Sequence, residues 1–398
     1  MTVWDSLVGQ RPVIKALADA ANGQGMSQAF LFTGPPGSGR SNAAVAFAAA
    51  LQCASTPPGC AECHSCSTVL AGSHADVSLV RTEKLSIGVD EVRDLVRRSA
   101  LAPVGKRWQV MIVEDADRLT EAACNALLKS IEEPSDRTVW ILCAPTVEDV
   151  LPTIRSRCRL VTLSTPSNHD VADFLVRSEG VSPPHASFAA RASQGHIGRA
   201  KALVRDEDTR NRRREVVQWP VRLTSLGACL NAASNLHDLA KSEAESITAE
   251  LDSREKVDLD ATYGVVERGR RPREYSPALS ALEKSQKTRA KRRILDVVDR
   301  GLMDLASVYR DAILLASGSQ VDLVNEELRG DLARLNRVCT PESHLARVEA
   351  IFEAREQMLE FNVPAQLALE SMMVALRLPE GSHPRNVSWQ LLRWPPWS

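Results

Sequence analysis

The sequence has no excess of basic residues, because 49 lysines and arginines are balanced by 50 aspartates and glutamates for a net charge of −1. A chain with this balance has no bulk attraction to nucleic acid, so any contact with DNA must come from a local patch or from a partner. Aromatic residues are also scarce, at 4%. The basic runs therefore lack the interleaved aromatic rings on which a sequence-independent single-strand binder stacks bases.

Long apolar runs are missing as well, and none approaches the roughly 20 residues that would span a bilayer. The opening residues, Met1-Thr2-Val3-Trp4-Asp5, include no basic or apolar leader segment. We therefore expect a cytoplasmic protein without membrane contact. Nine cysteines in 398 residues are too few for a disulfide scaffold, whereas the length allows two or three domains of about 100–150 residues each.

A glycine-rich stretch between an apolar run and an alanine-rich segment predicts a strand, a phosphate-binding loop and a helix. It reads Gly34-Pro35-Pro36-Gly37-Ser38-Gly39-Arg40-Ser41. Glycines let backbone N–H groups converge on an anion at a helix N-terminus. The pattern requires lysine at position 40, and the planar guanidinium of Arg40 does not replace a compact ammonium. The sequence thus predicts a nucleotide site with a defect.

Four of the cysteines follow this helix closely, at Cys53, Cys60, Cys63 and Cys66. This spacing lets four thiolates close tetrahedrally on one Zn²⁺, which would then have a structural role because no coordination position is left open. Two alternatives remain: four free cytoplasmic thiols, or a site in which His64 replaces one cysteine.

A second apolar run, Trp108 to Val113, predicts a buried strand that ends in two acids, Glu114 and Asp115. A P-loop ATPase places a metal-binding Asp and then a water-polarising Glu at this point. Here the order is inverted, so each side chain has the wrong length for its position. We favour a role in ending the strand over a working hydrolytic pair.

Alternating strands and helices through the first third of the chain predict an α/β fold with a parallel sheet covered on both faces. Helical patterns follow to the end, and their basic runs fit a solvated helix face better than a DNA-facing patch. We expect a nucleotide-binding-like domain (1–165, with the zinc module at 53–66), a small helical lid domain (166–208), a charged helical linker or insertion (209–293), a helical collar domain for oligomerisation (294–379) and a Trp-containing tail (380–398).

Several short motifs occur together in one order along the chain. They are Val8-Gly9-Gln10, the phosphate loop, the four cysteines, Asn125-Ala126-Leu127-Leu128-Lys129, Glu132-Glu133-Pro134, Ser156-Arg157-Cys158, Tyr309-Arg310-Asp311 and Asn362 with Leu367-Ala368-Leu369-Glu370. This ordered set resembles the clamp-loader family of bacterial DNA polymerase III, which is of the AAA+ class. The match is closest to its delta-prime subunits, and it covers most of the chain apart from residues 206–290 and the tail.

The resemblance also locates further departures. Ala144-Pro145 stands where the family senses the γ-phosphate with Thr or Asn, and Gly198 stands where an arginine is expected, with Arg199 one residue along. Together with Arg40 and the inverted acids, these departures are typical of delta-prime subunits, which commonly lack a working site. The resemblance implies that ATP or ADP, if bound, is bound weakly.

The Ser156-Arg157-Cys158 motif is intact, so the resemblance implies that Arg157 is an arginine finger that acts in trans on the ATP of a neighbouring subunit. The partners it implies are the gamma/tau and delta subunits in a ring that loads the β sliding clamp on primer-template DNA. The chain would belong to the DNA-directed DNA polymerase holoenzyme without itself being a hydrolase or polymerase. The alternatives are an active gamma/tau-like ATPase motor and a zinc-containing sequence-independent DNA-binding protein.

Overall fold

The computed structural model describes residues 2–82, 86–105, 107–263 and 272–379, so the predicted Trp-containing tail at 380–398 lies outside the described residues. The chain divides into two compact units, which we describe separately. The first contains residues 1–209 and 258–292, and the second contains residues 210–257 and the chain from 293 onward. Among the described residues, no helix is long and apolar enough to cross a membrane.

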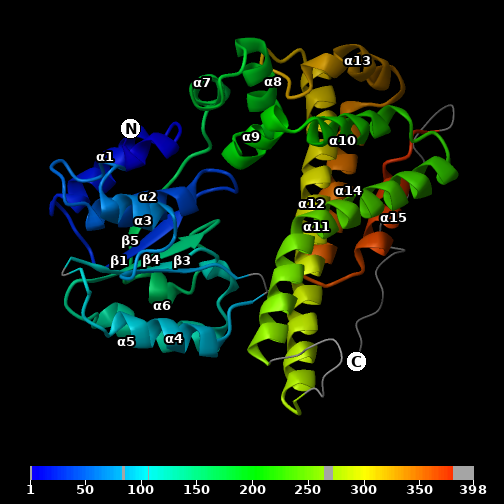
Figure 1. The fold of residues 1–398 in the computed structure, drawn as a ribbon. Coiled ribbons are helices and arrows are strands. Elements are labelled where there is room, and N and C mark those ends of the chain that lie inside the picture. Colours follow the sequence, from blue (N-terminus) through cyan, green and yellow to red (C-terminus); the bar gives the residue numbers. More distant parts are fainter. Residues whose placement is uncertain (1, 83–85, 106, 264–271, 380–398) are drawn as a thin grey trace. The chain divides into compact units, whose positions relative to one another are not determined.

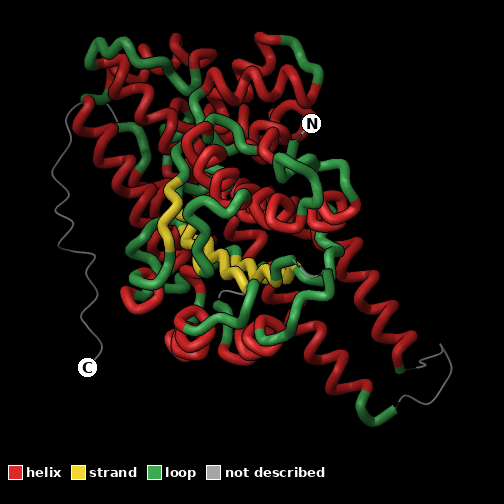
Figure 2. The backbone as a smooth tube through the Cα atoms, turned by 90° about the vertical axis from the view of Figure 1, so that its left-hand side faces the viewer, coloured by secondary structure: helices red, strands yellow, loops and turns green. Residues whose placement is uncertain are grey.

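The first unit is built on a sheet of parallel strands, drawn in yellow in Figure 2. Their order is β2-β3-β4-β1-β5. The strands are β1 (Ala29–Thr33), β2 (Val77–Val80), β3 (Gln109–Val113), β4 (Thr138–Ala144) and β5 (Arg159–Thr162). The three central strands are buried along their whole length, as expected for parallel strands covered on both faces. The predicted α/β class with a parallel sheet is therefore confirmed.

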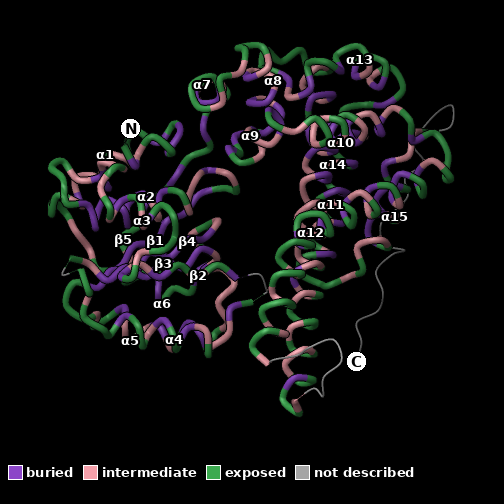
Figure 3. The backbone as a smooth tube through the Cα atoms, viewed as in Figure 1, coloured by how far each residue is buried: buried purple, intermediate pink, exposed green. Residues whose placement is uncertain are grey.

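Alternate residues of the central strands enter two separate cores. Phe30 and Ile141 pack on the face covered by α1 (Arg11–Ala21), α2 (Arg40–Gln52) and α3 (His64–Leu70). Leu31 and Trp140 pack on the opposite face, against α4 (Val89–Ser99) and α5 (Glu121–Glu132). Figure 1 shows these two helical layers above and below the strands, and Figure 3 shows how burial is concentrated between them.

The carboxyl ends of parallel strands meet at one edge of a sheet, and in doubly wound folds this edge carries the ligand site. Here the phosphate loop follows β1, Arg81 follows β2, Glu114 follows β3 and Pro145 follows β4. Short elements complete the module: η1 (Val3–Ser6), η2 (Ala116–Arg118) and α6 (Pro152–Arg155).

Three short helices after β5 form a small core of their own, made largely of alanine, valine and leucine. They are α7 (Asn168–Glu179), α8 (Pro183–Ser193) and α9 (Ile197–Arg205). The Ser167 side chain caps α7 by accepting from the N–H of Asp170, and Gly180 ends the helix with a φ of 67°. This part is the small helical lid of the predicted fold class.

The second unit is entirely helical in its described residues and has one core. Three of its helices continue into the first unit: α10 (Glu207–Gln218), α11 (Leu226–Thr262) and α12 (Tyr275–Ala316), of which residues 210–218, 226–257 and 293–316 belong to the second. Its other elements are η3 (Trp219–Val221), η4 (Glu326–Leu328), α13 (Arg329–Val338), α14 (Pro341–Leu359) and α15 (Ala365–Ala375). The core joins Val216, Trp219 and Leu236 to Leu302 and Met373. Part of the predicted linker 209–293 therefore packs into the same core as the predicted collar.

Candidate functional site

The phosphate loop has the strand–loop–helix setting that the sequence predicts. Gly37 and Gly39 adopt φ values of 86° and 92°, which only glycine adopts without strain. Gly39 is the N-cap of α2, and the N–H of Gly34 donates to the carbonyl of Pro145 (3.1 Å), so the loop is fastened to the end of β4. The backbone of an anion-binding loop is thus retained.

The side chain of Arg40 is turned back onto its own loop. Its Nη1 donates to the carbonyl oxygen of Gly34 at 2.8 Å. In a working P-loop the corresponding lysine reaches the β- and γ-phosphates. Here the Arg40 guanidinium is already hydrogen-bonded to the loop carbonyl of Gly34. This contact, in addition to the replacement of lysine by arginine, indicates a defective nucleotide site.

Both acids at the end of β3 are bound by arginines. Glu114 is nearly buried, with 7% of its side chain exposed, and Arg81 pairs with both of its oxygens, at 2.5 Å from Nε and 3.3 Å from Nη2. Asp115 pairs with Arg292 at 3.5 Å. A family ATPase would use this corner to hold Mg²⁺. The residues present do not fit that ion well, because cationic side chains already neutralise the two carboxylates.

The lid contacts the loop directly at Gly37. A Cβ atom added there would lie 2.5 Å from the Cα of His196, so the residue must be glycine for this approach. The His196 side chain accepts from the N–H of Arg199 and thereby caps α9. The Gln10 side chain joins the phosphate loop to the segment after β5, because its amide nitrogen donates to the carbonyls of Ser38 (3.3 Å) and Ser164 (2.6 Å).

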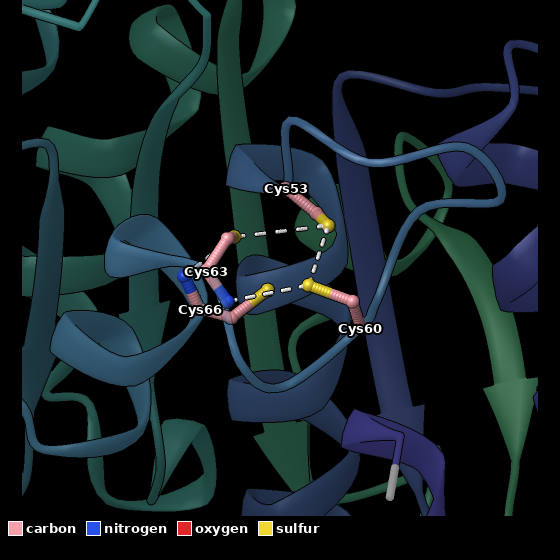
Figure 4. Close-up of side chains that lie close together, drawn as sticks. All are labelled: Cys53, Cys60, Cys63 and Cys66. Atoms are coloured by element: carbon pink, nitrogen blue, oxygen red, sulfur yellow. Dashed lines mark hydrogen bonds between the residues drawn. The ribbon is translucent and has the colours of Figure 1, made fainter.

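The four predicted zinc ligands converge at the end of α2 (Figure 4). The Sγ atoms of Cys53, Cys60, Cys63 and Cys66 all lie within 4.8 Å of one another. Cys53 Sγ lies 3.6 Å from Cys60 Sγ and 4.0 Å from Cys63 Sγ. A tetrahedron with Zn–S bonds of about 2.3 Å has S–S edges of about 3.8 Å, so this donor set fits a zinc ion.

The local backbone also favours thiolates. The N–H of Cys63 donates to Cys60 Sγ at 3.3 Å, and the N–H of Cys66 points to Cys63 Sγ at 3.5 Å. Hydrogen bonds from the Ser55 side chain and from the backbone N–H groups of Cys63 and Glu62 lower the pKa of Cys60 to about 6. Burial instead raises the pKa of Cys66, which lies against the α2 backbone. A bound cation would offset that burial.

Arg157 lies at the surface between α6 and β5. Its Nε is 2.6 Å from a carboxylate oxygen of Glu132, and its Nη1 donates to the Thr153 carbonyl at 2.7 Å. Ser156 contacts Nη1 at 3.2 Å, while burial of the half-exposed Cys158 raises its pKa to about 12. With 40% of its side chain exposed, Arg157 is accessible to a second molecule.

Comparison with known proteins matches residues 9–167 to the family model "DNA polymerase III, delta subunit". The DNA polymerase III subunit delta' of Pseudomonas aeruginosa is 34% identical over 48% of this chain and 60% of that protein. The delta' of Bacillus subtilis is 28% identical over 54% and 65%, respectively. The gamma/tau subunit of Mycobacterium bovis is 38% identical over 38% of this chain, but over only 27% of its own length.

The N-terminal module belongs to the clamp-loader subunits of the AAA+ class. The chain spans less than two thirds of the length of each of these relatives. Solved structures are only loosely similar, since a DNA polymerase III gamma subunit-related protein of Thermotoga maritima gives a TM-score of 0.39 at 16% identity over 92% of this chain and 98% of that one. The assignment rests on the family model and the curated relatives.

Sequence reasoning missed two residues of this clamp-loader module, Arg81 and Arg292. Arg81 could have been suspected, because it ends a short run of strand-forming residues and the carboxyl ends of parallel strands meet at one edge of the sheet. Arg292 gave no signal, since it is part of a basic run that reads as a solvated helix face. Each arginine neutralises one of the acids on which the predicted nucleotide site depends.

Proposed function

We propose that the chain is the delta-prime subunit of a DNA polymerase III clamp loader. In this role it is a subunit without ATPase activity of its own, in the ring that loads the β sliding clamp on primer-template DNA. The curated relatives support a clamp-loader subunit, and the delta' subunits of Bacillus subtilis and Pseudomonas aeruginosa match across a larger share of the chain than gamma/tau does. Its assembly with gamma/tau and delta subunits is part of the proposal.

The observation that carries the non-motor role is the set of arginine contacts in the nucleotide site. Arg40 is bound to the loop carbonyl of Gly34, and the acids Glu114 and Asp115 are each paired with an arginine. Hydrolysis needs a lysine on the phosphates, a metal ion and a positioned water. All three positions are compromised, whereas the loop N–H groups could still bind ATP or ADP weakly.

Arg157 is proposed to complete the ATP site of a neighbouring subunit. A guanidinium in trans stabilises the charge that develops on the transferred phosphoryl group. The exposure of Arg157 supports this role, and its contacts to Glu132 and Thr153 show how the side chain is held when no neighbour is present.

Apolar residues on the last two helices support assembly through the second unit. On α14, Leu345, Phe352 and Leu359 recur every seven residues and are 53%, 48% and 45% exposed. On α15, Leu367 and Val374 have the same spacing and are 59% and 41% exposed. Apolar side chains at this interval pack against a partner helix in helical bundles. We therefore assign these residues, the α14–α15 apolar residues, to contacts with other subunits.

The cysteine cluster is proposed to hold one structural Zn²⁺. It would join the end of α2 to α3, and the same loop is fastened to the N-terminus, where the N–H of Val3 donates to the carbonyl of Gly59 at 3.0 Å. A closed four-thiolate site leaves no position for a substrate, so its contribution is to stability.

The test is to measure ATP turnover by the purified chain alone and then to purify it with gamma/tau and delta subunits. The proposal predicts a stable complex and negligible turnover by the chain alone. Turnover of about 1 s⁻¹, at the low end of ordinary enzymes, would instead support the gamma/tau-like motor. Failure to join the complex, combined with salt-dependent DNA binding by the chain alone, would support the zinc-containing DNA-binding protein.

A further inference from the structure

Arg292 connects the ends of two neighbouring strands. Its Nη1 donates to the backbone carbonyl of Thr82, just after β2, at 2.6 Å. Its Nη2 lies 3.5 Å from a carboxylate oxygen of Asp115, just after β3. Arg292 belongs to α12, and its stretch of that helix, together with the rest of residues 258–292, groups with the sheet module in the first unit.

This contact is shielded from solvent. The side chain of Arg292 is only 16% exposed, that of Asp115 is 25% exposed, and Thr82 is buried. The neighbouring acid, Glu114, is more deeply buried and is paired with Arg81. Two guanidinium groups thus balance the two carboxylates, and a Mg²⁺ ion placed there would have to displace one of them.

We propose that the acidic corner at the end of β3 is a socket for residues 275–292, the part of α12 in the first unit, instead of a metal site. Arg292 anchors this stretch to the edge of the sheet that binds nucleotide and Mg²⁺ in a working P-loop ATPase. The guanidinium group takes the place of a dissociable metal ion, so this contact does not depend on nucleotide. This gives a role to part of the charged region that the clamp-loader motifs do not cover.

The socket predicts a local change when either partner is removed. In Arg292→Ala, we expect backbone amides within residues 275–292 to exchange hydrogen about three- to tenfold faster, the range for a partly buried ion pair. Asp115→Asn should produce a smaller change in the same segment, because it leaves the Arg292–Thr82 hydrogen bond in place. Because both substitutions remove the same Arg292–Asp115 ion pair, the double variant should exchange no faster than Arg292→Ala. Lys287→Ala is the matched control, since Lys287 is an exposed cation of the same helix.

Two further measurements, both on the full chain, separate an ionic socket from general destabilisation. Raising the salt concentration should accelerate exchange of this segment in the wild type but have little effect in Arg292→Ala. Calorimetric titration with Mg²⁺, with and without ATP, should show no binding that depends on Asp115.

Two results would overturn the proposal: additive effects in the double variant, or Asp115-dependent Mg²⁺ binding that also accelerates exchange in residues 275–292. All of these measurements use the isolated chain, so they are independent of its proposed place in a clamp loader.

Discussion

At the scale of single residues, the chemistry of the nucleotide site depends on three guanidinium groups. Arg40 is hydrogen-bonded to the phosphate loop and would have to break this bond to reach a phosphate group. Arg81 and Arg292 form ion pairs with the two acids that would otherwise hold a metal ion. The glycines of the loop are unaffected by these changes, because their conformations are backbone properties. A loop can therefore keep an anion-binding shape while the charged side chains around it are bound to other parts of the protein.

The first prediction at this scale concerns zinc. The purified chain should contain one Zn²⁺, and Cys63→Ser should reduce its zinc content and lower its thermal midpoint by several degrees, because a three-thiolate site binds less tightly. Metal analysis and thermal unfolding provide the measurements. Cys158→Ser, a half-buried cysteine outside the cluster, is the control and should keep its zinc. Zinc-free wild-type protein would refute the assignment.

The second residue-scale prediction concerns pH. His344 is fully buried on α14, with Nε2 3.0 Å from Asn336 Oδ1, and burial together with the nearby Arg347 lowers its pKa to about 4. The unfolded value is about 6.5. Since folding favours the neutral ring, stability is complete above pH 6.5 and is lost as the pH falls toward 4, by up to about 3 kcal/mol.

Urea unfolding of wild type and His344→Gln at several pH values checks this prediction. The variant should be less stable at pH 7, because the packing around the ring is lost, but its stability should fall less between pH 6.5 and pH 4. His169→Gln, which alters an exposed histidine on α7, should retain the wild-type dependence. Identical slopes in His344→Gln and the wild type would show that this ring does not titrate as described.

At the scale of elements, α14 and α15 carry the apolar residues proposed to contact other subunits. Phe352→Glu should leave the chain folded, because Phe352 is 48% exposed, but should weaken assembly by about 30-fold, the size expected for an interface hot spot. Gel filtration with the other subunits measures the change. Ile247→Glu introduces the same charge at an exposed position of α11 and should assemble normally. Equal assembly by the two variants would show that Phe352 is not part of the subunit interface.

Elements were predictable wherever local pattern decides the structure. The apolar runs predicted β1 and β3, and the glycine spacing predicted the loop between β1 and α2. The cysteine spacing predicted a cluster that the fold does bring together. Each of these features is encoded within a few consecutive residues, so no knowledge of distant contacts was needed.

Contacts between distant segments were not predictable in the same way. Arg81 is 33 residues from Glu114, and Arg292 is 177 residues from Asp115. A charged side chain has the same local signature whether it is solvated or paired, so the local sequence does not pair either arginine with its acid. For the same reason, the buried Arg213, which binds Asp304 at 3.2 Å, was read as part of a solvated basic run.

At the scale of the whole molecule, we propose an AAA+ module without its own hydrolytic chemistry and a helical unit whose exposed apolar residues contact other subunits. The useful chemistry of such a chain would be exerted on a neighbour. In the proposed assembly Arg157 is the group that acts across the interface, and its present contacts to Glu132 and Thr153 would be exchanged for contacts to phosphate.

The most direct test is clamp loading by an assembly reconstituted with Arg157→Ala, with Arg155→Ala, another exposed arginine beside the motif, as the control. We predict normal assembly for both variants. Trans-acting arginines in related chemistry supply about 10³–10⁵ in rate, so Arg157→Ala should nearly abolish hydrolysis at the facing site and sharply reduce loading. Total ATP turnover should fall only by the share of that site. Unchanged loading by a correctly assembled Arg157→Ala complex would contradict the account.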